Sequence, residues 1–187
     1  GETTHLSVLD TEGNAVGLTQ SLNLVYGAKV ATPGLGFLYN KYIEAFQFGK
    51  PGHDYNLRPG GIPWPCATPT IVFKNELPWL VLGSPGSQRI FSSMAQFLSL
   101  VIDQQMSIDK AMLHPRIHAE HNGELSLEID RIEPSIIEFL KKKGYRIKAR
   151  EPYAFYMGGI HAAMKCLSAN GFQGAADVRR DGTAMGT

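Results

Sequence analysis

The stretch that decides the fold is residues 3–23, TTHLSVLDTEGNAVGLTQSLN. Residues 4–10 alternate between polar and apolar side chains, residues 11–14 (TEGN) have the composition of a turn, and residues 15–23 return as a second strand-like segment. Alternation on both sides of a Gly-containing turn is typical of a β-hairpin. The sequence therefore predicts that the chain opens with a hairpin and that Thr3 lies where its first strand begins.

Downstream of this hairpin, the pattern predicts a second hairpin and a buried helix. Apolar runs at 70–73 and 79–82 flank the connection 74–78, and residues 90–103 place apolar side chains at helical spacing. Residues 49–65 are rich in Gly and Pro and predict a long surface loop, which in a compact domain is often functional. Shorter elements are expected as helices over 107–114 and 133–143 and as strands over 145–149, 159–166 and 174–176.

The composition is that of one globular domain. The chain has 187 residues, enough for a single core, and no composition shift divides residues 1–187. Hairpin strands with helices segregated from them predict an α+β fold of packed layers. A net charge of +1 spread along the chain gives no sign of nucleic-acid binding, and no apolar run approaches the roughly 18 residues of a membrane span. For Cys66 and Cys166, two buried thiols are the simpler expectation and a disulfide is the alternative.

Thr3 is a candidate nucleophile. A threonine hydroxyl reacts only when a base takes its proton, and an N-terminal threonine supplies that base as its own α-amino group, with a pKa of about 7.7–8.0. The alternative, suggested by composition alone, is an ordinary β-branched residue at a strand start.

Residues 83–87, GSPGS, are a second candidate feature because they lie between a predicted strand and the helix that follows. Glycine lets backbone N–H groups approach a ligand closely, and a helix N-terminus favours negative charge, which is what an oxyanion hole requires. A plain strand-to-helix turn is the alternative. The loop lacks the Gly-Lys-Ser/Thr ending of a phosphate-binding loop.

Seven short blocks occur in order, and together they resemble the small subunit of γ-glutamyltranspeptidases over essentially the whole chain. The blocks are TTHLSV (3–8), DTEGNAV (10–16), SLNLVYG (21–27), PTIV (69–72), GSPGSQRI (83–90), HPRIH (114–118) and GAADVRR (174–180). The resemblance implies the four-layer αββα sandwich of N-terminal-nucleophile hydrolases, of which this chain would be the small-subunit half. It also implies a zymogen that cuts itself before the first threonine, a large-subunit partner from the same precursor, a role in glutathione metabolism, no cofactor, and a periplasmic or secreted location.

The resemblance assigns roles to five residues. Thr3 matches the nucleophile that becomes the N-terminus, and Ser21 occupies the position of the hydroxyl that supports it. Asn23 matches the family's active-site asparagine. Gly86 matches the first glycine of the oxyanion pair, and Ser87 replaces the second while keeping a backbone N–H.

The positions that bind the γ-glutamyl donor match the family less well. Where the family places its polar residue and second aspartate, which grip the donor's α-amino group, this chain has Tyr42 and Ala45, with Glu44 adjacent. Where two serines bind the donor's α-carboxylate, it has Pro65 and Cys66. Unpaired charges are costly, so the acyl-transfer machinery is expected to be kept while the γ-glutamyl pocket is altered.

Other candidates are weaker. Arg89 opens the helix after the Gly-rich loop and is a candidate partner for an acidic acyl chain, with a surface ion pair as the alternative. His114, His118 and His121 are spaced like metal ligands, but a structural role is favoured and no metal site is predicted.

Three functions follow. The first is a γ-glutamyltranspeptidase-like acyltransferase or amidohydrolase acting through an acyl-enzyme. The alternatives are a glutaryl or cephalosporin-type acylase with an altered donor pocket and a catalytically silent scaffold or binding protein. Because Gly1 and Glu2 precede Thr3, no turnover is expected while Glu2 remains attached.

Overall fold

The computed structural model describes residues 2–49, 51–166 and 171–186. Short 3-10 helices are labelled η. The elements in chain order are β1 (Thr3–Leu9), β2 (Ala15–Ser21), η1 (Tyr42–Ala45), β3 (Thr70–Lys74), β4 (Leu77–Gly83), α1 (Arg89–Ile102), α2 (Ile108–Leu113), β5 (Ile117–Ala119), β6 (Glu124–Glu128), η2 (Ile129–Arg131), α3 (Pro134–Lys142), β7 (Arg146–Arg150), η3 (Phe155–Met157), β8 (His161–Lys165) and β9 (Phe172–Ala176).

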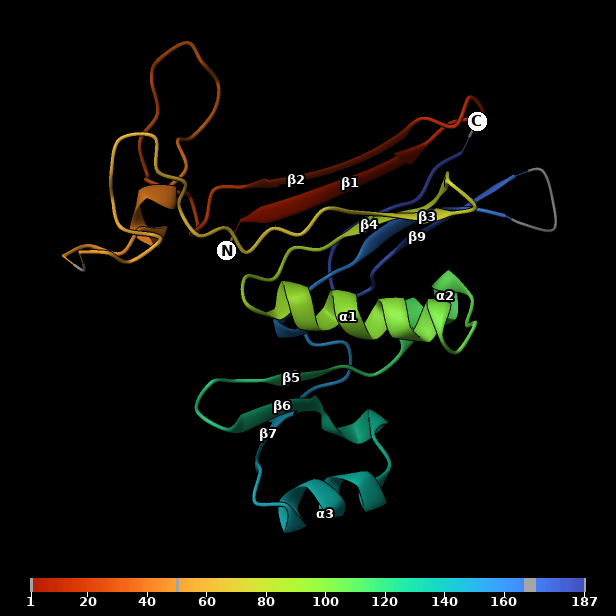
Figure 1. Ribbon diagram of the computed structural model, residues 1–187. Coiled ribbons are helices and arrows are strands. Elements are labelled where there is room, and N and C mark those ends of the chain that lie inside the picture. Colours follow the sequence, from red (N-terminus) through yellow and green to blue (C-terminus); the bar gives the residue numbers. More distant parts are fainter. Residues whose placement is uncertain (1, 50, 167–170, 187) are drawn as a thin grey trace.

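These elements form stacked layers (Figure 1). The β1–β2 hairpin packs on one face of a four-stranded sheet of order β3-β4-β8-β9, and α1 and α2 cover the other face. A three-stranded sheet, β5-β6-β7, lies beyond α1, with α3 outside it. The α+β prediction is confirmed, and the described residues supply two β-layers and one α-layer of the predicted αββα sandwich.

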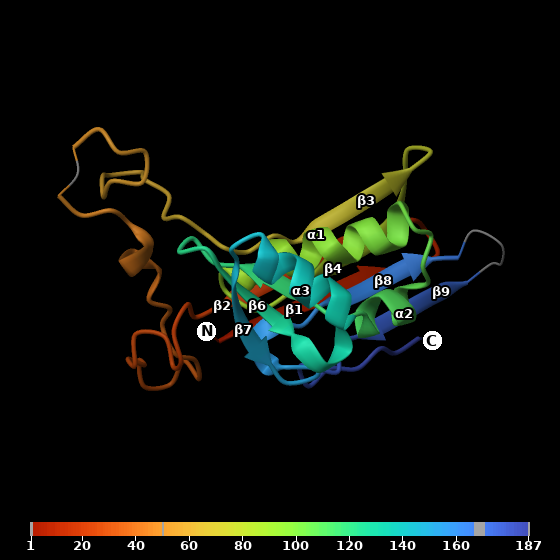
Figure 2. The same ribbon diagram turned by 90° about the horizontal axis from the view of Figure 1, so that it is seen from below.

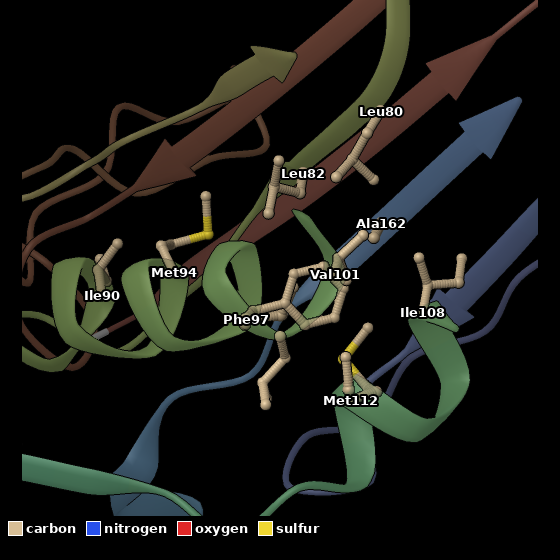
Figure 3. Close-up of a cluster of buried hydrophobic side chains, with 12 residues drawn as sticks. Leu80, Leu82, Ile90, Met94, Phe97, Val101, Ile108, Met112 and Ala162 are labelled. Carbon is tan, nitrogen blue, oxygen red and sulfur yellow. The ribbon is translucent and has the colours of Figure 1, made fainter. Parts of the chain in front are cut away.

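The main core lies between the four-stranded sheet and the two helices (Figure 3). Leu80 and Leu82 point from β4 towards Phe97 and Met94 on α1, and all four are at most 4% exposed. The helical spacing that predicted this helix therefore corresponds to its buried face. Burying each such side chain contributes about 1.5–3 kcal/mol.

The β1–β2 hairpin turns polar side chains towards the sheet beneath it and apolar side chains outward. Its inward face carries Thr3, His5 and Ser7, whereas its outward face carries the cross-strand pairs Leu6–Leu18 and Val8–Val16. These four apolar side chains are 43–55% exposed. A sheet face that exposes a continuous apolar patch usually marks a contact surface.

The segment between β2 and β3 lies away from the layers and forms an arm, defined here as residues 22–67 (Figure 2). Apart from η1, the arm's described residues are irregular, with bridges pairing Ala31 with Leu38 and Gln47 with Asn56. The predicted loop over 49–65 is thus part of a longer irregular segment. Many of its apolar side chains are exposed, including Leu24, Val25, Phe37, Ile43, Phe48 and Ile62.

Two parts of the structure differ from the predictions. The β3–β4 turn consists of Asn75 and Glu76 alone, both at positive φ, and the strand already begins at Leu77. The β5–β6 hairpin was not predicted, and its polar residues Ser126 and Glu128 face inward, where both are fully buried. The Asn122-Gly123 pair at its turn was the available signal.

A buried ion network explains why β6 can carry a carboxylate inward. The Glu128 carboxylate accepts two hydrogen bonds of 2.6 Å from the Arg179 guanidinium, and a further one of 2.9 Å from Arg131. Asp177 accepts from Arg179 at 3.1 Å, and also from Arg116 and from the backbone N–H of Ile160. The network connects the three-stranded sheet with the segment that follows β9 and, through Ile160, with the start of β8.

Candidate active site

Thr3 faces a second hydroxyl across the hairpin. The register pairs Thr3 with Ser21, and their Oγ1 and Oγ atoms are 2.8 Å apart. The Ser21 hydroxyl also accepts a hydrogen bond of 3.0 Å from the backbone N–H of Asn23, which lies at positive φ, just past the end of β2. Asn23 donates its side-chain amide to the Lys41 carbonyl at 3.3 Å, which joins the end of the hairpin to the arm.

His5 fixes the register next to this pair. Its ring nitrogens lie 2.7 Å from Thr19 Oγ1 and 2.9 Å from Ser7 Oγ, and Ser7 donates to the His161 carbonyl at 3.1 Å. The ring lies against Gly83, where any Cβ would come within 2.2 Å of it. Burial, with a smaller contribution from the nearby His161, lowers the pKa of His5 to about 4, so at neutral pH the ring is uncharged.

The loop at residues 83–87 joins β4 to α1 in an unusual backbone conformation. Gly86 has φ 140°, and a Cβ there would lie 2.9 Å from the Cα of Gly158. Ser87 follows at φ 55°. Within the described part of the chain, the N–H groups of Gly86 and Ser87 donate to no protein acceptor. The loop is supported from behind by Ser84, whose hydroxyl accepts from Gly159 N–H at 3.1 Å.

A cavity of about 270 Å³ brings these parts together. One wall comes from the hairpin, the residue Asn23 just past it, and the loop and first turn of α1, with Thr3, Ser21, Asn23, Ser87, Gln88 and Ile90. The opposite wall comes from the arm, with Tyr42, Glu44, Ala45, Gln47, Trp64, Cys66 and Ala67.

Most of the residues predicted for the site thus share one cavity, namely Thr3, Ser21, Asn23, Tyr42, Glu44, Ala45, Cys66 and Ser87. Gly86 and Pro65 are neighbours of residues in the lining and are not themselves part of it.

Arg89 is also outside the lining, because its side chain turns to Tyr156. Its Nε donates to the Tyr156 carbonyl at 3.1 Å and its guanidinium carbon lies 4.2 Å from the ring centroid. Five lining residues were not predicted: Gln88 and Ile90 lie in the GSPGSQRI block, whereas Gln47, Trp64 and Ala67 carry no motif that would have marked them.

The cavity holds little charge. Glu44 forms an ion pair of 2.6 Å with Lys41 at the surface. Partial burial raises the pKa of the Cys66 thiol, against a smaller opposing effect of Arg89, so the thiol is protonated at neutral pH.

The histidines that suggested a metal are separated by the fold. His118 is buried on β5 and bonds through Nδ1 to Ser92 Oγ at 2.8 Å, whereas His114 is exposed and bonds to the Pro115 carbonyl. Among the residues described, no group of three His, Cys, Asp or Glu side chains is placed to hold a metal ion.

Both cysteines are free thiols. In the part of the chain that the structure describes, no helix combines the length and apolarity that crossing a bilayer requires.

This layered arrangement, with a threonine hydroxyl at the start of a strand that lies over a second sheet, is that of the N-terminal-nucleophile hydrolases. Within that class, the chain belongs to the γ-glutamyltranspeptidase family: the model of the family described as Gamma-glutamyltranspeptidase matches residues 1–187.

Individual relatives agree with this assignment. The chain is 36% identical over 185 residues to the acylase ACY 1 proenzyme of a Pseudomonas strain, covering 98% of this chain and 32% of that protein. It is 32% identical over 196 residues to the glutathione hydrolase proenzyme of Pseudomonas aeruginosa, covering 98% and 34%. A mutant Helicobacter pylori γ-glutamyltranspeptidase structure superposes with a TM-score of 0.83 at 33% identity, covering 95% of this chain and 100% of that chain. The chain spans about a third of the length of these curated relatives.

Proposed function

We propose that the chain is the catalytic part of an acyltransferase or amidohydrolase in which Thr3 Oγ1 attacks an amide carbonyl. The observation that carries the proposal is the Thr3–Ser21 hydroxyl pair at 2.8 Å in a cavity that also receives Ser87. The Thr3 α-amino group would take the hydroxyl proton and pass it to the leaving amine, leaving an acyl ester on Thr3. Water or a second amine would then accept the acyl group.

The unpaired N–H groups of Gly86 and Ser87 would stabilise the oxyanion formed in each step. Both come from the loop that precedes α1, so the positive end of the helix dipole adds to their effect. Ser21 would orient the Thr3 hydroxyl, and the Asn23 backbone N–H in turn orients Ser21.

We infer that the Glu2–Thr3 bond must break before this chemistry begins, because Thr3 has no free α-amino group while Glu2 is attached. The Glu2 carbonyl already accepts a hydrogen bond of 2.8 Å from Leu22 N–H, so the carbonyl that Thr3 would attack is held rigidly at the end of the hairpin. Attack by Thr3 Oγ1 would convert the amide to an ester and free the amine, and water would then hydrolyse the ester.

The partner in this proposal is the remainder of a two-subunit proenzyme. The outward apolar face of the hairpin and the exposed apolar side chains of the arm support it, because both need a cover. The relatives are proenzymes about three times the length of this chain, which leaves room for such a subunit.

The residues of the arm wall bear on which acyl donor the site takes. Tyr42, Ala45 and Cys66 stand in the cavity where the family's γ-glutamyl-binding residues are expected, and this favours an acylase over a glutathione hydrolase. The acylase relative at 36% identity supports the same choice. A silent binding protein is the remaining alternative.

The test uses the complete precursor. Intact-mass analysis should show a subunit that begins at Thr3, and this processed protein should release aniline from an acyl anilide. A protein that is folded, processed at Thr3 and inert towards every acyl anilide would favour the silent alternative.

A further inference from the structure

We propose that the acyl group taken by this cavity is uncharged and carries a flat aromatic end that packs against Trp64. The inference rests on the proposed function, since it concerns the donor side of the same cavity. Its support is the aromatic and apolar side chains of the arm wall and the contacts that the nearby charged side chains make.

The arm wall offers an aromatic surface that is already held in place. Trp64 lines the cavity, remains 51% exposed, and stacks on Tyr55 with ring centroids 5.9 Å apart and planes inclined by 17°. One face of the indole is thus supported by Tyr55, and Trp64 still contributes to the lining. A planar group in the acyl chain can stack or pack edge-on there.

The neighbouring side chains suit apolar groups. Ala45, Cys66 and Ala67 lie in the same wall, and Ile90 faces them from α1. The Cys66 thiol stays protonated, so it behaves as a small apolar side chain. The volume of about 270 Å³ lies just below the usual range for ligand pockets and suits one acyl group.

Charge argues against an acidic acyl chain. Glu44 is the acidic side chain in the lining, and its ion pair with Lys41 at 2.6 Å already neutralises that cation, so Lys41 is not free to bind a terminal carboxylate. Neither Arg89 nor Arg180 lines the cavity: Arg89 donates its Nε to the Tyr156 carbonyl, and the guanidinium carbon of Arg180 lies 3.2 Å from the Phe155 ring centroid. Among the described residues no Lys, Arg or His lines the cavity, so a carboxylate bound here would lose water without gaining a cation from the lining.

The experiment compares three p-nitroanilides on the processed, complete protein: phenylacetyl, glutaryl and γ-glutamyl. The phenylacetyl compound should have the highest kcat/KM, by about tenfold or more, which corresponds to one good packing contact and one avoided unpaired charge. A higher kcat/KM for the glutaryl or γ-glutamyl compound would overturn the inference and leave the proposed function intact. No turnover of any anilide, with no acyl group on Thr3, would overturn both.

Two variants test the packing contact of Trp64 and the charge of Glu44 separately. Trp64→Ala should raise KM for the phenylacetyl anilide about threefold to tenfold, and Trp64→Phe should restore most of the loss. Glu44→Gln should raise the kcat/KM of the glutaryl compound relative to that of the phenylacetyl compound. An unchanged phenylacetyl KM in Trp64→Ala, or an unchanged ratio in Glu44→Gln, would contradict the proposed contacts.

Discussion

The two walls of the cavity are built in different ways. The wall that holds Thr3, Ser21 and Ser87 comes from a hairpin and a helix start that are packed on a buried sheet. The wall that holds Tyr42, Trp64 and the other arm residues comes from an irregular segment that lies away from the core. In the proposed function, the first wall supplies the reacting groups and the second wall selects the substrate. Chemistry needs atoms held in place, whereas recognition can change by substitution in a loop.

Removing the nucleophile should have the largest effect. Thr3→Ala should lower kcat by about 10⁴-fold or more, because no other hydroxyl in the cavity carries its own amine. Thr3→Ser keeps the hydroxyl and should retain measurable turnover. The assay is anilide release by the complete protein; because Thr3→Ala also removes the hydroxyl proposed to cut the Glu2–Thr3 bond, intact mass records the processing state of each variant in the same experiment. Turnover in Thr3→Ala close to that of the parent would show that another group attacks.

Breaking the ion network should show how much the rigid wall depends on it. Asp177→Ala leaves Arg116 and Arg179 buried without one of their carboxylates, which should lower the free energy of unfolding by about 3–5 kcal/mol. The measurement is a urea unfolding curve of the complete protein. Tyr26→Ala, at an exposed position of the arm, is the control and should lower the free energy of unfolding far less. Equal losses would contradict the division into a rigid and an adaptable wall.

Moving the Gly-rich loop should affect kcat more than KM. A Cβ at position 86 would lie 2.9 Å from the Gly158 backbone, and an alanine there would have to adopt φ 140°. Gly86→Ala must therefore shift the loop. Loss of one oxyanion donor costs about 10²- to 10³-fold in kcat. Gly13→Ala, also at positive φ but with nothing within 4 Å, tests backbone strain alone and should leave kcat near that of the parent. A Gly86→Ala protein with the parent kcat would exclude this loop as the oxyanion site.

The smallest effect concerns pH. The pKa of His5 falls from 6.5 to about 4 on folding, so acid protonates the unfolded chain first. Stability from this residue is complete above pH 6.5 and is lost as the pH falls from about 6.5 to about 4. Urea midpoints at several pH values should fall less steeply for His5→Gln over this window. Some slope should remain, since burial also lowers the pKa of His118 and of His161. Identical slopes would mean that His5 is not buried uncharged.

The sequence predicts the wall formed by the hairpin and α1 better than the wall formed by the arm. The physical reason is the separation along the chain between the residues that interact. The first hairpin and α1 follow from alternation and helical spacing, which are local signals. The sequence gives no sign that Glu128 of β6 faces inward, because its partner Arg179 lies 51 residues away. No pattern in the sequence reveals such a pairing.

The same distinction holds within the site. The family resemblance assigned Ser21 to support Thr3, and the hairpin register accounts for this assignment because it pairs the two residues. Trp64 and Gln47 reach the cavity through an irregular arm whose path depends on contacts far along the chain. The direction of Arg89 was equally hidden, because its partner Tyr156 lies 67 residues away.

The most direct test of the account is to locate the acyl group during turnover. The complete, processed protein is mixed with an acyl anilide, quenched in acid within one turnover, digested and analysed by mass spectrometry. If Thr3 is the nucleophile, the peptide beginning at Thr3 gains the mass of the acyl group and loses it again when water or an amine is allowed to react. Steady turnover with that peptide unmodified, or with the acyl group on another residue, would contradict the account.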